Sequence, residues 1–128
     1  MDYAQAKQYC AHKPEAELDY PFGPEPAAFK IKGKIFALLS RYQDRDIVSL
    51  KCDPERAIAL RDLYEDVIAG YHLNKKHWNT VFLDNDIADS ELEIMIDHSY
   101  ALVVKSLKKA ERTSLEVKYP SEQLYAGQ

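Results

Sequence analysis

The chain has 128 residues, which is the length of one ordinary domain and too short for two. Its hydrophobic share of 46% and charged share of 30% are typical of a globular protein and exclude a disordered one. The net charge of −4 excludes a protein whose whole surface binds nucleic acid, because such binding depends on cations that release counterions from the phosphates. Any contact with a polyanion would therefore be local.

Neither a membrane span nor an export signal is expected. No apolar run approaches the roughly 18 residues that cross a bilayer, and the opening residues lack an apolar signal segment. Cys10 and Cys52 are far apart and lie in apolar stretches, so we expect two buried free thiols and no disulfide. These features favour a cytoplasmic protein with no membrane partner.

The first residues predict a short helix followed by an irregular connection. Asp2 is a suitable N-cap, and apolar residues recur at helical spacing until Pro14 prevents continuation. Residues 14–26 are rich in proline, which restricts the backbone locally. We expect this connection to be ordered by its prolines and by burial of Tyr20 and Phe22.

Residues 27–52 predict three antiparallel strands. Apolar and lysine residues alternate in the first strand, and a tight turn at residues 32–34 leads into the apolar run 35–39. The third strand, at 46–52, alternates between two faces. Short strands that follow one another directly favour an antiparallel sheet.

The second half predicts a helix, a strand and a long helix. Asp53 and the proline after it are suited to begin a helix that ends near Asp66. Residues 78–83 alternate as a fourth strand. A stripe of apolar residues from a cap at Asp89 or Ser90 to Leu107 predicts a long helix, with acids in its first turn and lysines near its last.

The expected fold is therefore α+β. An antiparallel sheet of about four or five short strands would pack with three main helices. Residues 1–114 would form a single domain, and residues 115–128 a polar C-terminal tail that is frayed or adds one loose turn.

Charge is strongly segregated along the sequence. Residues 15–25 and 84–97 carry acids and neither lysine nor arginine. The cations gather in three groups, so the local field there can be positive despite the negative net charge. The groups are Lys30, Lys32 and Lys34; His72, Lys75, Lys76 and His77; and Lys105, Lys108, Lys109 and Arg112.

The residues that could bind a metal or act in catalysis form no recognisable set. His72 and His77 flank two lysines, whose charges repel a divalent cation. The acids of 84–97 lack the glycine and the ligand spacing of a calcium loop. His98 is expected at the surface. Because no standard catalytic motif is present, we expect a non-enzymatic protein without metal or cofactor.

Residues 70–79, GYHLNKKHWN, are the most unusual stretch of the chain. They combine two imidazoles, two ammonium groups, two amides and the only tryptophan. Cations for phosphates, amides for hydrogen bonds and an aromatic ring for stacking are the groups that nucleic-acid binding uses. The plainer interpretation is that Trp78 belongs to the core, the amides cap turns and the lysines are solvated.

Five blocks of the sequence carry a family resemblance. They are DYPFGPE at 19–25, FKIKGKIFALLS at 29–40, SLKCDPE at 49–55, GYHLNKKHWNTVFLD at 70–84 and DHSYALVVKSL at 97–107. With these blocks, roughly residues 3–112 resemble the MmcQ/YjbR-like family of small bacterial proteins. The resemblance implies an α+β fold similar to that of type III secretion chaperones. It also implies a proposed double-wing DNA-binding motif, in which the hairpin at 30–34 would be one wing.

Our first hypothesis is a non-enzymatic DNA-binding protein of this family that contacts phosphates through a local basic patch. The contacts would come from Lys30, Lys32, Lys34, His72, Asn74, Lys75, Lys76, His77, Trp78 and Asn79, with Arg41 or Lys51 as further cations. The alternative is a protein-interaction module, chaperone-like or self-associating, that binds no nucleic acid. A third hypothesis is a small-molecule or phosphate pocket around Tyr71, His72 and Trp78.

Overall fold

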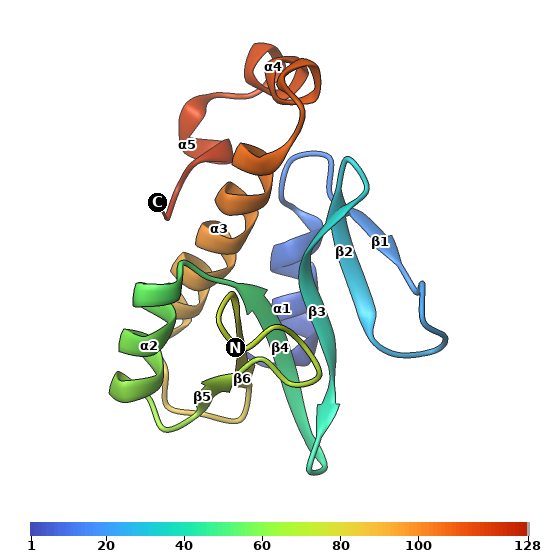
Figure 1. The fold of residues 1–128 in the computed structure, drawn as a ribbon. Coiled ribbons are helices and arrows are strands. Elements are labelled where there is room, and N and C mark those ends of the chain that lie inside the picture. Colours follow the sequence, from blue (N-terminus) through green and yellow to red (C-terminus); the bar gives the residue numbers. More distant parts are fainter. Residues whose placement is uncertain (128) are drawn as a thin grey trace.

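The computed structural model describes residues 1–127, which form one antiparallel sheet of six strands together with five helices (Figure 1). The strands lie in the order β1-β2-β3-β4-β6-β5. They are β1 (Glu17–Asp19), β2 (Ala27–Ile31), β3 (Lys34–Tyr42), β4 (Arg45–Lys51), β5 (Val67–Ala69) and β6 (Trp78–Phe82). The helices are α1 (Tyr3–Ala11), α2 (Pro54–Leu63), α3 (Asp89–Ser106), α4 (Lys109–Lys118) and α5 (Ser121–Leu124). The α+β class is confirmed, with more strands and helices than the sequence predicted.

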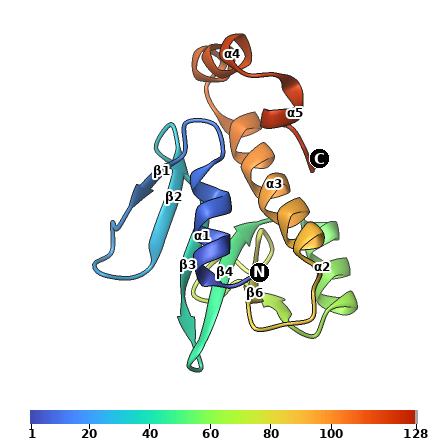
Figure 2. The same ribbon diagram turned by 180° about the vertical axis from the view of Figure 1, so that it is seen from behind.

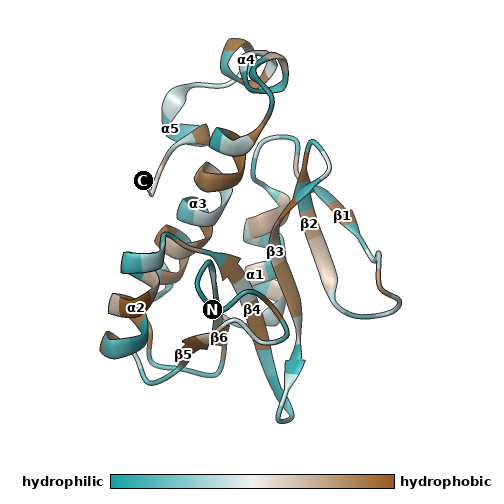
Figure 3. Ribbon diagram, in the orientation of Figure 1, coloured by the Kyte–Doolittle hydropathy of each residue, from teal (hydrophilic) through white to brown (hydrophobic). Residues whose placement is uncertain are grey.

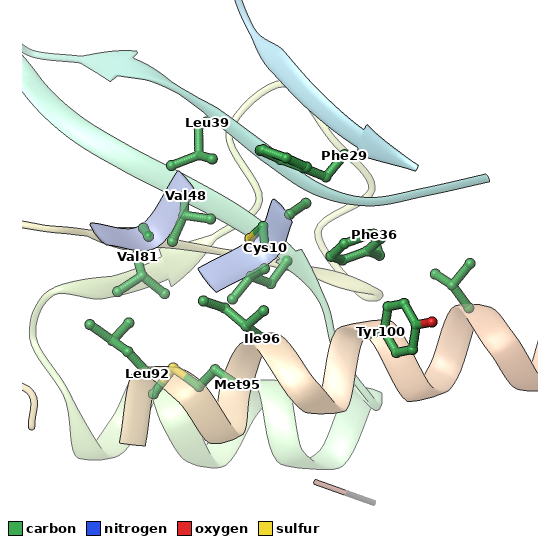
Figure 4. Packing of buried hydrophobic residues seen from close by; sticks show 14 of the residues in the cluster. Cys10, Phe29, Phe36, Leu39, Val48, Val81, Leu92, Met95, Ile96 and Tyr100 are labelled. Atoms are coloured by element: carbon green, nitrogen blue, oxygen red, sulfur yellow. The ribbon is translucent and has the colours of Figure 1, made fainter. Parts of the chain in front are cut away.

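Helices α1, α2 and α3 cover one face of the sheet, which we call the helix face. Seen from behind, α1 and α3 lie in front of the strands (Figure 2). Leu39, Val48 and Val81 pair in one row across β3, β4 and β6. They share a buried cluster with Leu92 and Ile96 of α3, which point at the sheet (Figure 4). Each fully buried aliphatic side chain of this kind contributes about 1.5–3 kcal/mol, so this layer is the main source of stability.

Two tight turns set the register of the central strands. Lys32 (φ 50°) and Gly33 (φ 82°) have the left-handed backbone that a two-residue hairpin turn requires between β2 and β3. The hairpin predicted at residues 32–34 is therefore confirmed. Gln43 (φ 54°) and Asp44 (φ 59°) make an equivalent turn between β3 and β4. Figure 3 shows the hydrophobic middle of these strands and the hydrophilic β3–β4 turn.

The connection between α1 and β2 differs from the expectation. It contains β1, which pairs with β2 at the edge of the sheet. Tyr20 and Phe22 are 44% and 68% exposed, so the predicted burial of these rings is wrong. Strands β1 and β5 were missed because each has three residues, too few for an alternating pattern to be visible.

The C-terminal segment is folded, and the predicted loose tail is wrong. Helix α4 runs across residue 114, and α5 follows it. Leu115 and Leu124 are fully buried in the same core as the sheet. Arg56 of α2 donates from Nη1 to the carbonyl oxygen of Gly127 at 2.7 Å. Residues 115–127 are therefore packed on the domain that was expected to end at 114.

The helix ends follow the sequence in part. Asp2 is the N-cap of α1, as predicted, and it also forms a capping box with Gln5. Helix α2 ends at Leu63, before the predicted end near Asp66. Helix α3 has no side-chain cap, so neither Asp89 nor Ser90 plays that role. No helix within residues 1–127 is long and apolar enough to cross a membrane.

Candidate functional site

The antiparallel topology gives the sheet two ends that carry different loops. One end has the β2–β3 turn, the end of β4, the loop 70–77 and the end of α3. The pairing of Lys51 with Trp78 and a hydrogen bond from Lys34 Nζ to the Ser106 carbonyl oxygen, at 3.0 Å, join these segments. The other end has the β3–β4 turn, at the bottom of Figure 1, with the end of β6 and the start of α3.

Charge divides between these two ends. We call the first the basic end; its cations are Lys34, Lys51, Lys75, Lys76, His77, Lys105, Lys108, Lys109 and Arg112. We call the second the acidic end; its acids are Asp44, Asp46, Asp66, Asp84, Asp86 and Asp89. The segregation seen along the sequence is thus also a segregation in space.

At the acidic end the arginines are neutralised. Arg45 Nη2 lies 3.0 Å from Asp66 and 2.7 Å from Asp84. A hydrogen bond from Arg45 lowers the pKa of the Asp84 carboxyl, with burial opposing. Arg41 Nη1 donates to Asp46 at 2.9 Å. Arg41, considered as a phosphate contact from the sequence, therefore lies in an ion pair among acids.

At the basic end the named lysine and arginine side chains have no carboxylate partner in the described chain. Lys75 Nζ donates to the Gly70 carbonyl oxygen at 3.0 Å, and Arg112 donates to the Lys105 carbonyl oxygen at 3.4 Å. These are neutral partners. Although Asp53 also lies at this end, no carboxylate within residues 1–127 forms an ion pair with any of the cations named for it. Glu111 lies among these cations, and Glu15 pairs with Lys32 of the adjacent turn, but the unpaired cations outnumber the acids, so this end keeps a net positive charge.

The loop 70–77 presents its cations to solvent. Asn74 Oδ1 accepts hydrogen bonds from the backbone N–H groups of Lys76, at 2.9 Å, and His77, at 3.2 Å. The Asn74 amide therefore shapes the turn, as the plainer interpretation of the segment expected. Lys75, Lys76 and His77 are exposed as a result.

Two of the three hairpin lysines are neutralised by neighbouring acids. Lys30 Nζ lies 2.8 Å from Asp19 Oδ2, and Lys32 Nζ lies 3.1 Å from Glu15 Oε1. The acidic stretch that precedes the hairpin in sequence thus folds back beside it. Only Lys34 of this group adds an unpaired charge to the basic end.

The remaining predicted contacts lie elsewhere. Asn79 is 3% exposed, accepts from Arg61 Nη1 at 2.8 Å and donates to the Ala57 carbonyl oxygen at 3.2 Å, so its amide serves the fold. Trp78 is half-buried. The His72 ring lies 4.1 Å from the ring of Tyr71, in a different group of aromatic residues.

The structure adds residues that the sequence did not bring together. Lys105, Lys108, Lys109 and Arg112 were visible as a charge group but could not be placed at the same end of the molecule as Lys34 without the structure. The sequence did predict the end of α3 near these residues. The structure shows that this last turn lies beside the β2–β3 turn, because Lys34 donates a hydrogen bond to the Ser106 carbonyl oxygen.

Other reactive side chains are internal. Cys10 and Cys52 are buried free thiols, as predicted, and burial raises the pKa of Cys10 to about 12 and that of Cys52 to about 11. His98 is 6% exposed, so the expectation of a surface histidine is wrong. Within residues 1–127, no three or more His, Cys, Asp or Glu side chains are grouped as a metal site would need.

The architecture defines an α+β domain with an antiparallel sheet, helices on one face and charge divided between its ends. The chain belongs to the YjbR family, whose profile matches residues 11–102. It is 39% identical to the uncharacterized protein YbdF of Escherichia coli O157:H7 over 107 residues, covering 84% of this chain and 88% of that protein. It is 36% identical to the uncharacterized protein YjbR of Escherichia coli strain K12 over 115 residues, covering 90% and 98%.

Solved structures share the fold. Protein DR2400 of Deinococcus radiodurans is 37% identical and superposes with a TM-score of 0.81, covering 90% of this chain and 88% of that one. A Pseudomonas syringae protein is 29% identical with a TM-score of 0.71, covering 80% and 98%. The resemblance drawn from the sequence blocks is confirmed as family and fold. The names of these relatives state no activity.

Proposed function

We propose that this protein is a non-enzymatic domain that binds the phosphate backbone of DNA with its basic end. The observation that supports the proposal is the set of unpaired cations carried by the segments at one end of the sheet, namely the β2–β3 turn, the end of β4, the loop 70–77 and the end of α3 with the start of α4. A lysine that already has a carboxylate partner gains little free energy by contacting a phosphate. An unpaired lysine gains more, because its contact with a phosphate releases a counterion from the DNA. The acidic end would repel the duplex and so orient the protein on it.

The contact set differs from that expected from the sequence. The cations are Lys34, Lys51, Lys75, Lys76, Lys105, Lys108, Lys109 and Arg112, with His77 among them. Lys30 and Lys32 are left out because they are ion-paired, and Asn79 because it is buried. Phosphate contacts position a protein without reading sequence, so binding should tolerate any base sequence.

Fluorescence anisotropy with a mixed-sequence duplex tests the proposal. The wild-type affinity should fall with salt at a slope of about −3 to −4 in a double-logarithmic plot, which corresponds to about four phosphate contacts. Replacing Lys75 and Lys76 with alanine should reduce the slope by about two and weaken binding at least about tenfold at low salt.

The matched control is the variant with Lys30→Ala and Lys32→Ala. It makes the same change in net charge but removes lysines that already have carboxylate partners. We expect its salt slope to equal that of the wild type. Equal weakening by both variants would show that only net charge matters, and no binding at low salt would reject DNA as the partner.

A further inference from the structure

The face of the sheet opposite the helices is covered by loops alone, and we call it the loop face. Leu38, Ile47 and Phe82 are 8%, 1% and 5% exposed there. Ser49 is paired with Leu38 and with Thr80 in neighbouring strands. The cover comes from the connection 20–26 and from the loop 70–77, which crosses in front of β4 in Figure 1. Both segments belong to the sequence blocks that carry the family resemblance.

A cavity of about 320 Å³ is lined by residues of both loops. Its floor is formed by Leu38, Ser40 and Ser49 of the sheet. Phe22 forms one wall, and Tyr71 and His72 form the other. This volume is at the lower end of the range for small-molecule sites, which is about 300–1,000 Å³.

One wall is held in place before any ligand arrives. The Tyr71 ring stacks on Tyr42 at 4.1 Å between centroids, and the Tyr71 N–H donates to Thr80 Oγ1 at 2.9 Å. The His72 and Tyr71 ring centroids lie 4.1 Å apart. The backbone of His72 has a φ of 58°, a left-handed conformation that costs a non-glycine residue about 1–2 kcal/mol. The rings of Tyr71 and His72 thus lie together on this wall.

The opposite wall is an aromatic ring left in water. Phe22 is 68% exposed although it borders the cavity. A ligand inserted between Phe22 and Tyr71 would cover apolar surface that the protein alone leaves wet, at a gain of about 25 cal/mol per Å². Aromatic walls favour a flat ring, because stacked rings gain about 0.5–1.5 kcal/mol beyond burial.

The described residues of the lining offer a ligand no permanently charged side chain. Among the described residues that line the cavity there is no lysine, arginine or carboxylate. Ser49 Oγ and Thr80 Oγ1 form a hydrogen bond of 2.7 Å, whereas the Ser40 hydroxyl makes no hydrogen bond to another residue of the described chain. We infer that this cavity binds a neutral, planar molecule of one or two rings, stacked between Phe22 and Tyr71 with a polar edge at Ser40. The inference stands apart from the DNA proposal.

Ligand-observed ¹⁹F NMR with 5-fluoroindole tests the inference, because this probe is neutral, flat and carries one N–H donor. We expect saturable line broadening with the wild-type protein. Phe22→Ala should weaken binding at least fivefold without unfolding the chain, because that side chain is mostly exposed. His72→Gly should also weaken it while keeping the fold, since glycine accepts a φ of 58° without strain.

Two controls decide the outcome. Leu63→Ala removes a side chain that is 69% exposed on α2, away from the cavity, and should leave binding unchanged. A charged analogue, indole-3-carboxylate, should bind at least fivefold more weakly than the neutral probe. Binding that is lost equally in Leu63→Ala, or retained in both Phe22→Ala and His72→Gly, would overturn the inference. The Lys76→Ala variant should bind the probe normally, which separates this result from the DNA test, because Lys76 is not among the described residues that line the cavity.

Discussion

His98 links three parts of the chain through its two ring nitrogens. Nε2 accepts a hydrogen bond from the Asp53 N–H at 3.1 Å, and Nδ1 lies 2.9 Å from the Gly127 carbonyl oxygen. The first bond requires an unprotonated Nε2, so the second is a donation from Nδ1–H. Burial, followed by the nearby Arg56 charge, lowers the pKa of His98. The neutral ring is therefore the form that the fold uses.

This arrangement predicts a pH-dependent stability. The unfolded chain takes up a proton on histidine near pH 6.5, whereas folded His98 resists protonation until lower pH. The free energy of unfolding should therefore fall as pH drops below about 6.5 and level off once folded His98 is also protonated. Urea unfolding between pH 8 and 5.5 measures it, and His98→Gln should show a smaller decline. Identical profiles for the two proteins would remove His98 as the cause.

The two thiols should be unreactive in the native protein. Burial raises the pKa of Cys10 to about 12 and of Cys52 to about 11, so the thiolate that attacks disulfides is scarce near neutral pH. Titration with a chromogenic disulfide at pH 8 should release little colour before denaturant is added and two equivalents afterwards. Fast labelling of either thiol in the native state would contradict the packing described here.

At the scale of elements, the C-terminal helices close the core. Leu124 of α5 is 1% exposed, whereas Val117 on α4 is 81% exposed. Leu124→Ala should lower the free energy of unfolding by about 2–4 kcal/mol, because a buried leucine leaves a cavity when truncated. Val117→Ala, the surface control, should change it by less than about 0.5 kcal/mol. Equal small effects in thermal or urea unfolding would mean that the tail does not contribute to the core.

The elements that could be predicted are those with a long or punctuated pattern. Asp2 marks the start of α1, and Pro14 prevents the helix from continuing. The turn residues at 32–34 predict the hairpin between β2 and β3. Helices α4 and α5 were not predicted, because each buries a single leucine in a segment that is otherwise mostly polar. Phe22 was expected inside because it is apolar, and only the structure shows it bordering a cavity.

For the molecule as a whole, the charge groups were visible in the sequence but their meaning depended on topology. Partners decide which cations remain free, and the partners of Lys30 and Lys32 come from β1 and the connection before it. The contribution of Lys105 and its neighbours depends on the direction of α3, which runs from the acidic end to the basic end. The sequence therefore identified the cations but could not show which of them are ion-paired and which lie at the same end of the molecule.

The central claim concerns where DNA meets the protein, and ¹⁵N-resolved NMR with a short duplex tests it most directly. Amide shifts should move at Lys34, at Lys51, through residues 74–77 and through 105–112, and these changes should fade as salt rises. Residues 43–46 and 84–89 at the acidic end should not move. Shifts centred on the acidic end or on residues 20–26, or none at low salt, would contradict the proposed interface.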